Sequence, residues 1–137
     1  MPGHELKDAV VAVVGASGVL GSHVARGVVE RGGTVILVGR DEQRLSDLGI
    51  KGAPIVVADL SDSSAGDHLV TVAREKFGRL DGLINAAGVV AFGNLVDTED
   101  AVIEELFFTN VIGPLWMLRR TAHLLAESQG FVLNISA

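Results

Sequence analysis

The chain has 137 residues, 48% of them apolar, and its 17 acidic and 11 basic residues give a net charge of −6. This composition excludes a disordered tail, and the acidic balance argues against nucleic acid or an anionic membrane as the main partner. The absence of Cys excludes a disulfide framework and a thiolate metal site, and it is compatible with a reducing compartment.

No targeting or membrane segment is expected from the apolar runs. The run near the start of the chain extends only from Ala9 to Val14, far short of the roughly 18–20 residues that span a bilayer. Glu5 and Asp8 precede it, whereas the first region of a signal peptide is positively charged. We therefore expect a cytoplasmic protein.

Short apolar runs alternate with longer amphipathic segments along the whole chain. The runs are continuous and rich in β-branched residues, which is typical of strands buried on both faces. In chain order, the predicted strands are Ala9–Val14, Thr34–Val38, Pro54–Ala58, Gly82–Asn85 and Phe131–Ile135. The predicted helices are Leu20–Arg31, Asp41–Leu48, Ser64–Phe77 and one or two helices over Asp97–Gln129, with a break near Asn110.

Strands separated by helices imply a parallel sheet with right-handed crossovers, and strands that are apolar throughout need helices on both faces. We therefore predict a single domain, residues 1–137, with a doubly wound α/β fold and the strand order 3-2-1-4-5. Such sheets bind ligands beyond the carboxyl ends of their strands. The chemistry should therefore lie just after each apolar run.

A glycine-rich turn, Gly15–Gly21, follows the first predicted strand. Gly15 allows the tight turn, Gly18 lets the backbone approach a pyrophosphate, and Gly21 allows close packing of helix on strand. The next helix offers free N–H groups and its positive dipole end to phosphates. A purely structural turn is the alternative. The absence of a following Gly-Lys-Ser/Thr argues against a nucleoside-triphosphate P-loop.

The residues after the second strand bear on which dinucleotide is bound. An NAD-preferring site usually has an acid there to hold the ribose hydroxyls, and this chain has Gly39 instead. Arg40 can pair with a 2′-phosphate through its forked guanidinium. We therefore favour NADP(H), with NAD(H) as the other candidate. An exposed Arg40 without a ligand role is the alternative.

Two more strand ends carry candidate cofactor residues. The Asp59 carboxylate could accept the adenine amino group while Leu60 packs beside the ring, although capping of the next helix explains Asp59 equally well. The small residues of Asn85–Gly88 would let the backbone lie against the adenosine ribose. The Asn85 amide could tie neighbouring strand ends together, and a plain turn is the alternative reading of this segment.

Together these motifs resemble the short-chain dehydrogenases/reductases, a family of NAD(P)-dependent oxidoreductases with a Rossmann-like fold. The resemblance covers about Leu6–Ala137. The motifs that carry it, in order, are Gly15–Gly21, Arg40, Asp59-Leu60, Asn85-Ala86-Ala87-Gly88, Asn110-x-x-Gly113 and Asn134-Ile135-Ser136.

The resemblance implies transfer of a hydride between nicotinamide and an alcohol or carbonyl substrate. It also implies a cofactor site formed by Gly15, Ser17, Gly18, Val19, Leu20, Gly21, Arg40, Asp59, Leu60, Asn85, Ala86, Ala87 and Gly88. It assigns Asn110 to a helix kink that holds a proton-relay water, and it leaves Ser136 as the candidate for the serine that steadies the substrate oxygen. Family members often pair through the long helix, so a homo-oligomer is expected.

The chain also departs from the family pattern. Val19 stands where most members have the central glycine, and Ala137 aligns with the catalytic serine. The sequence contains no Tyr, so the family's Tyr-x-x-x-Lys acid/base motif is absent, as are the usual C-terminal strands. Phe131–Ile135 would then be an exposed apolar edge, which favours a missing segment over a partner chain at that edge.

Two hypotheses follow. The first is the front part of an NADP(H)-preferring short-chain oxidoreductase, and the second is a non-catalytic dinucleotide-binding sensor or partner module. A different nucleotide-binding enzyme such as a methyltransferase is weakened by Asn85–Gly88. The four histidines, His4, His23, His68 and His123, match no metal motif, so no metal site is predicted.

Overall fold

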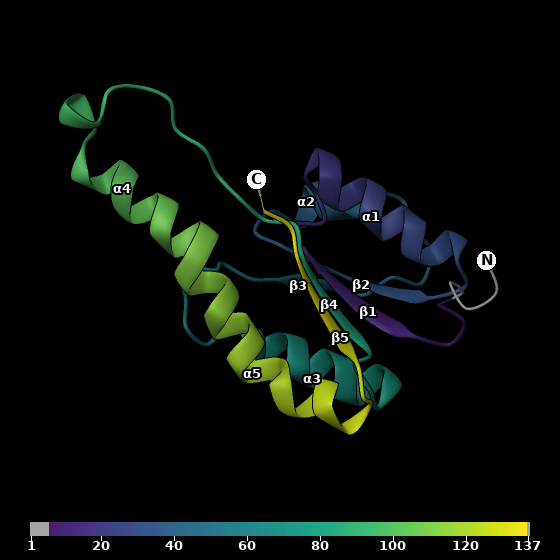
Figure 1. Cartoon of the computed structure of the whole chain (residues 1–137). Coiled ribbons are helices and arrows are strands. Elements are labelled where there is room, and N and C mark those ends of the chain that lie inside the picture. The colour runs from purple at the N-terminus through teal and green to yellow at the C-terminus, as the bar shows by residue number, and fades with distance from the viewer. Residues whose placement is uncertain (1–5, 137) are drawn as a thin grey trace.

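The structure is a computed structural model that describes residues 6–136. Its five strands form one parallel sheet in the order β3-β2-β1-β4-β5, which confirms the predicted topology (Figure 1). The strands are β1 (Val10–Val14), β2 (Thr34–Gly39), β3 (Ile55–Val57), β4 (Gly82–Asn85) and β5 (Phe131–Asn134). Ala137, the residue aligned with the family's catalytic serine, lies outside the described residues.

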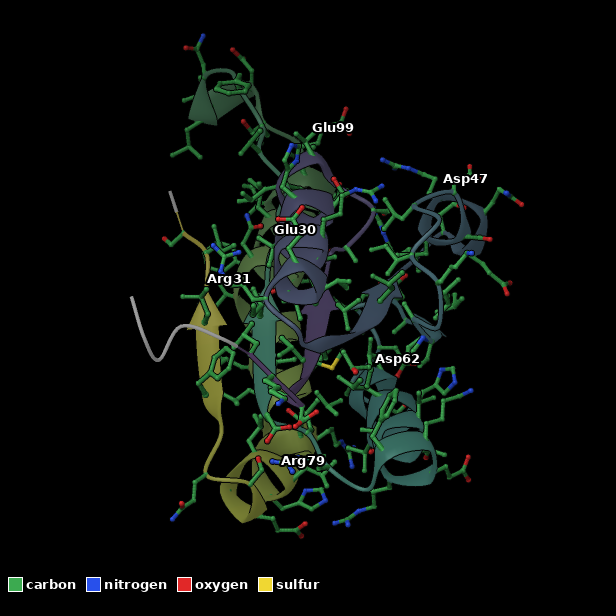
Figure 2. All side chains as sticks on the ribbon, turned by 90° about the vertical axis from the view of Figure 1, so that its right-hand side faces the viewer. Glu30, Arg31, Asp47, Asp62, Arg79 and Glu99 are labelled. Carbon is green, nitrogen blue, oxygen red and sulfur yellow. The ribbon has the colours of Figure 1, made fainter. Side chains whose placement is uncertain are left out.

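Helices cover both faces of this sheet. The helices of the described residues are α1 (Val19–Glu30), α2 (Glu42–Ser46), α3 (Ala65–Phe77), α4 (Asp100–Phe107) and α5 (Gly113–Glu127), with a 3-10 turn at Leu95–Asp97 and a π segment at Phe108–Ile112. Of these, α4 extends beyond the sheet. Figure 1 shows α1 and α2 on one face and α3 and α5 on the other. Charged side chains such as Glu30, Asp47 and Asp62 lie on the outside of these layers (Figure 2).

The core has two halves because every residue of β1 is buried. Alternate residues of a strand point to opposite faces. Val10, Ala12 and Val14 accordingly pack with α3 and α5, whereas Val11 and Val13 pack with α1 and α2. The continuous apolar run correctly predicted that β1 is buried on both faces of the sheet. This packing fixes the end of β1, where the glycine-rich turn begins.

The long helix is continuous from Asp100 to Glu127, because the expected break near Asn110 is a π segment rather than an interruption. By length and composition alone, this 28-residue helix could cross a membrane, although the sequence shows no uninterrupted apolar run of that length. In the fold it is a layer helix, since its α5 part packs on α3 and β4. Only 11% of its most apolar window is buried within the chain.

The last strand, β5, lies at the edge of the sheet, as the sequence predicted. All its residues are exposed, including Phe131, Val132 and Leu133. The Phe131 ring lies directly over Gly82 of β4, where a Cβ would come within 2.4 Å of Phe131 Cζ. A glycine at the start of β4 therefore makes room for the only aromatic residue of the edge strand.

Candidate functional site

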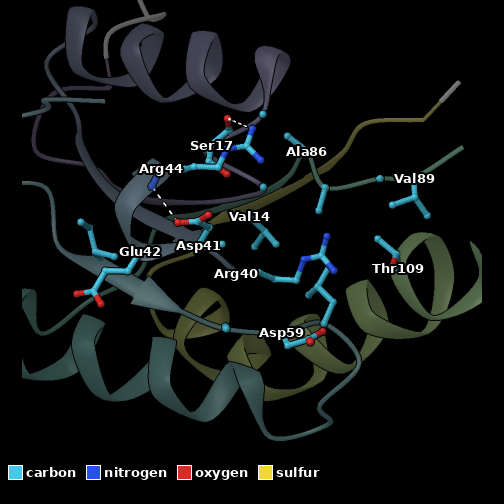
Figure 3. A pocket seen from close by; sticks show the side chains of 18 of the residues that line it. Val14, Ser17, Arg40, Asp41, Glu42, Arg44, Asp59, Ala86, Val89 and Thr109 are labelled. Carbon is cyan, nitrogen blue, oxygen red and sulfur yellow. Dashed lines mark hydrogen bonds between the residues drawn. The ribbon is translucent and has the colours of Figure 1, made fainter. Parts of the chain in front are cut away.

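A cavity of about 1020 Å³ opens at the carboxyl ends of β1, β2, β3 and β4 (Figure 3). Its walls include most of the predicted cofactor residues, namely Gly15, Ser17, Gly18, Arg40, Asp59, Leu60, Ala86, Ala87 and Gly88. The predicted residues that do not line it are Val19, Leu20, Gly21, Asn85, Asn110 and Ser136. Parallel strand ends meet at one edge of a sheet, which is why segments so distant in sequence share this cavity.

The glycine-rich turn is shaped by two very close backbone approaches. Gly15 has a φ of +79°, and a Cβ on it would lie 2.6 Å from the Ala87 nitrogen. A Cβ on Gly21 would lie 1.9 Å from the Gly15 carbonyl oxygen. The turn is therefore pressed against the segment after β4 on one side and against α1 on the other, which supports the predicted roles of these two glycines.

Helix α1 begins at this turn with its N-terminus free of side-chain caps. Its N-cap, Gly18, contributes no side-chain acceptor, and the first turn carries no acidic residue. A Cβ on Gly18 would meet only the Gly15 oxygen, at 3.4 Å, so space remains in front of it. Uncapped N–H groups and the positive end of the helix dipole together favour an anionic ligand such as a phosphate.

The segment after β2 brings two arginines to the cavity. Arg40 directly follows the strand, and Arg44 lies on α2. Asp41 accepts a hydrogen bond from the Arg44 N–H at 3.1 Å, so it caps α2. Helix α2 ends at Ser46, two residues earlier than the sequence predicted. Sequence reasoning missed Arg44, which belongs to none of the cofactor motifs in the sequence.

Asp59 is held in a local turn at the floor of the cavity. Its Oδ1 accepts from the Ser61 N–H and the Ser61 hydroxyl, both at 2.9 Å. These two bonds, and more weakly the positive charge of Arg40, hold the pKa of Asp59 below its usual value against the raising effect of burial and of Asp62. Asp62 forms a similar turn by accepting from the Ser64 N–H at 2.8 Å, and neither aspartate caps α3, whose N-cap is Ser64 and which has no side-chain cap. Asp59 therefore offers an ionised carboxylate to the cavity.

The Asn85 amide does not make the tie between strand ends that the sequence suggested. The side chain is buried, but its Oδ1 has no hydrogen-bond partner among the described residues. The strands are joined instead by the backbone, where Ile135 N–H donates to the Asn85 carbonyl at 3.0 Å. Strand pairing thus satisfies the backbone hydrogen bonds at this point, while the side-chain amide oxygen has no partner among the described residues.

Asn110 forms a two-way clamp on the segment after β4. Its Oδ1 accepts from the Val89 N–H at 2.9 Å, and its Nδ2 donates to the Val89 carbonyl at 2.8 Å. The π segment contains Asn110, so the expected irregularity of the helix is present at this residue. Sequence reasoning missed Val89 and Thr109, which both line the cavity and show no motif of their own.

Ser136 is exposed and follows β5 outside the cavity lining. Its proposed contact with a substrate oxygen therefore stays a prediction. Among residues 6–136, no group of three or more His, Asp or Glu side chains could hold a metal ion.

Comparison with known proteins places this arrangement in context. Residues 9–137 match the sequence model of the short chain dehydrogenase family. An uncharacterised oxidoreductase of Staphylococcus epidermidis is 29% identical over 97% of this chain and 60% of its own length. The 11-beta-hydroxysteroid dehydrogenase A of Sesamum indicum is 32% identical over 93% of this chain and 39% of its own.

Solved structures give the same picture. A short chain dehydrogenase from Mycobacterium smegmatis matches with a TM-score of 0.83 at 30% identity, over 94% of this chain and 57% of that one. The aldohexose dehydrogenase of Thermoplasma acidophilum matches with a TM-score of 0.86 at 21% identity, over 96% of this chain and 50% of that one, which is a likeness of fold. The chain spans about 60% of the length of the first curated relatives it matches.

Proposed function

The chain belongs to the short-chain dehydrogenase family, and from this premise we propose that it is the cofactor-binding front part of an NADP(H)-preferring oxidoreductase. The substrate would be an alcohol or a carbonyl compound. The observation that carries the proposal is the cavity at the carboxyl ends of four strands, which is lined by the uncapped N-terminus of α1 together with Arg40 and Asp59. The domain 1–137 would then be part of a longer dehydrogenase domain, which fits the share of its relatives that it spans.

Different groups of lining residues fit different parts of a dinucleotide. The N-terminus of α1 behind Gly18 suits the pyrophosphate, and the ionised Asp59 suits an adenine amino group beside Leu60. The small side chains of Ala86 and Ala87 leave the backbone open to a ribose. A bound nicotinamide would supply the hydride or accept it.

Asn110 and Ser136 are the residues of this chain that we propose near the reaction itself. Asn110 fixes the segment after β4 through Val89, so it would keep that wall of the cavity in place. Ser136 would steady the substrate oxygen. The proton donor of the family mechanism is a Tyr, and the sequence of this chain contains none. We therefore assign proton transfer to no residue here.

NADPH and NADH titrations followed by nicotinamide fluorescence, together with assays of NADPH oxidation by simple aldehydes and ketones, test this proposal. Tight NADPH binding supports the cofactor assignment. Turnover of a carbonyl substrate would exclude the non-catalytic dinucleotide-binding module, whereas binding without turnover fits both readings, because the sequence of this chain contains no Tyr. Failure to bind either nucleotide would overturn both readings.

Replacing Arg40 with Ala should weaken NADPH binding about tenfold and NADH binding less than twofold. The reason is that only NADPH carries the 2′-phosphate, and a charge-assisted bond contributes about 1.5–3 kcal/mol before solvent screening reduces it. Fluorescence titration of both nucleotides measures the ratio. Gln43→Ala is the matched control, because Gln43 is exposed on the same wall and uncharged. Equal losses for both nucleotides would contradict the role of Arg40.

We also propose that the protein forms a homodimer through the outer face of the long helix. Exposed apolar residues recur there at helical spacing, with Phe107, Val111 and Leu115 each between 45% and 60% exposed. Exposed Glu104 stands at one end of this stripe and exposed Arg119 at the other. Two copies packed antiparallel would pair apolar residues with apolar residues and each Glu104 with the partner's basic end.

Leu115→Asp should shift this dimer to a monomer, because a carboxylate would be buried against apolar side chains. Size-exclusion chromatography with light scattering measures the mass. The control is His68→Asp, which places the same charge at an exposed position on α3. A wild-type protein that is monomeric at every concentration, or a dimer that Leu115→Asp leaves intact, would contradict the interface.

The cytoplasmic location stays a prediction that cell fractionation would test.

A further inference from the structure

The charges around the adenine side of the cavity pose a problem for phosphate recognition by Arg40 alone. The lining includes two arginines, Arg40 and Arg44, against three carboxylates, Asp41, Glu42 and Asp59. Asp59 is ionised, so the negative charges on this part of the lining outnumber the positive ones. A 2′-phosphate monoester carries about −1.5 to −2 at neutral pH. A single guanidinium among these carboxylates would therefore attract it weakly.

Arg44 supplies a second guanidinium to the same wall of the cavity. Its main chain is fixed by the bond from its N–H to Asp41 Oδ1. Its side chain reaches back to the glycine-rich turn, where Nη2 donates to the Ser17 carbonyl at 3.4 Å. Figure 3 shows Arg44 beside Ser17 and Arg40 nearer Asp59, with Asp41 between them. The two guanidiniums thus stand on either side of the end of β2.

The bond from Arg44 to Ser17 is a weak anchor. Its length of 3.4 Å exceeds the usual range of about 2.7–3.2 Å for such bonds. The residue is exposed, and its other guanidinium N–H groups donate to no described residue. A phosphate oxygen would offer a shorter, charge-assisted bond. Exchanging the carbonyl for a phosphate would therefore be favourable.

We propose that Arg44 is a second ligand of the cofactor's 2′-phosphate, and that NADPH is preferred over NADH only while Arg40 and Arg44 are both present. The inference rests on the proposed function, since it concerns the same dinucleotide site. It extends that function by naming a specificity residue on α2 that binds from the side of the glycine-rich turn, opposite the carboxylate of Asp59.

The test compares 2′,5′-ADP with 5′-AMP, two probes that differ only by the 2′-phosphate. Isothermal titration calorimetry of the 137-residue chain measures both affinities. Arg44→Gln should weaken 2′,5′-ADP binding about tenfold and 5′-AMP binding less than twofold. The matched control is Arg26→Gln, because Arg26 also donates to a carbonyl near α2, that of Leu48 at 2.9 Å, but does not line the cavity. This control should change neither affinity.

The outcomes separate the inference from the function on which it rests. Equal losses for both probes in Arg44→Gln would mean that Arg44 holds the turn or contacts adenine, and would overturn the inference. An unchanged ratio would leave the 2′-phosphate to Arg40 alone and overturn it as well. A wild-type chain that binds neither probe would instead overturn the proposed function. Partial recovery of the ratio in Arg44→Lys would support a role of the charge itself.

Discussion

Gly21→Ala is expected to lower the free energy of unfolding by about 3 kcal/mol and to abolish dinucleotide binding. The new Cβ would lie 1.9 Å from the Gly15 carbonyl oxygen and 2.7 Å from its carbon. Both are backbone atoms of a turn that cannot retreat, since the turn is itself packed so closely on the segment after β4 that a Cβ on Gly15 would lie 2.6 Å from the Ala87 nitrogen. Urea denaturation and NADPH titration measure the two effects.

Gly18→Ala is the matched control for this substitution. A Cβ on Gly18 would meet only the Gly15 oxygen, at 3.4 Å, and Gly18 has an ordinary extended conformation. We expect stability to change by less than about 1 kcal/mol, the usual cost of an Ala at an N-cap. Binding should still weaken, because Gly18 lines the cavity. If Gly21→Ala unfolded at the same urea concentration as the wild type, the close approach of α1 to the turn would not be what stabilises the site.

The two substitutions show which part of the site can be predicted from sequence. The sheet order, the burial of β1 on both faces and the gathering of the strand ends follow from hydrophobic runs and the rules for parallel sheets. Gly15, Arg40 and Asp59 could be placed on one cavity for the same reason, because each directly follows a predicted strand. All of these features depend on the path of the backbone through the strands and helices. The pattern of hydrophobic residues predicts that path.

Side-chain paths were not predictable in the same way. The clamp between Asn110 and Val89 depends on a π segment, whose hydrogen-bond register no periodicity reports. The reach of Arg44 to Ser17 depends on rotamers along a flexible chain. The Asn85 amide was expected to bond across strands, but backbone pairing met that need and left its oxygen without a described partner. Each of these polar side chains has several possible hydrogen-bond partners, and the sequence does not show which partner it contacts.

Asp81 is a further residue that the sequence pattern did not single out. It lies at the amino ends of β1 and β4, whereas the cavity lies at the carboxyl ends of the strands. Its buried carboxylate accepts from the Val10 N–H at 2.8 Å and from two nitrogens of Arg79, a surface arginine visible in Figure 2. The Asp81 backbone also pairs with Val10 and with Phe131. The carboxylate and the backbone of this one residue thus join three neighbouring strands, β1, β4 and β5, at their starts.

Asp81→Asn should reduce stability by about 2 kcal/mol at pH 7, because an amide cannot replace a carboxylate that accepts from a buried N–H and a guanidinium. Half of the Arg79 side chain is exposed, which keeps this value below that of a fully buried pair. Urea denaturation at several pH values measures the difference from the wild type. The control is Asp8→Asn, since Asp8 is exposed and its φ of 62° is one that Asn accepts readily.

The pH dependence identifies the cause of this loss. Burial raises the pKa of Asp81, but the side-chain bonds from Arg79, the Val10 N–H and the charge of Arg79 together hold it below the usual value. The carboxylate therefore contributes its full stabilisation above the unfolded pKa of about 3.9, and this is lost as the pH falls through the lower folded pKa. The difference between wild type and Asp81→Asn should shrink over that acid range. A constant difference would mean that Asp81 stabilises the strand starts by its shape rather than its charge.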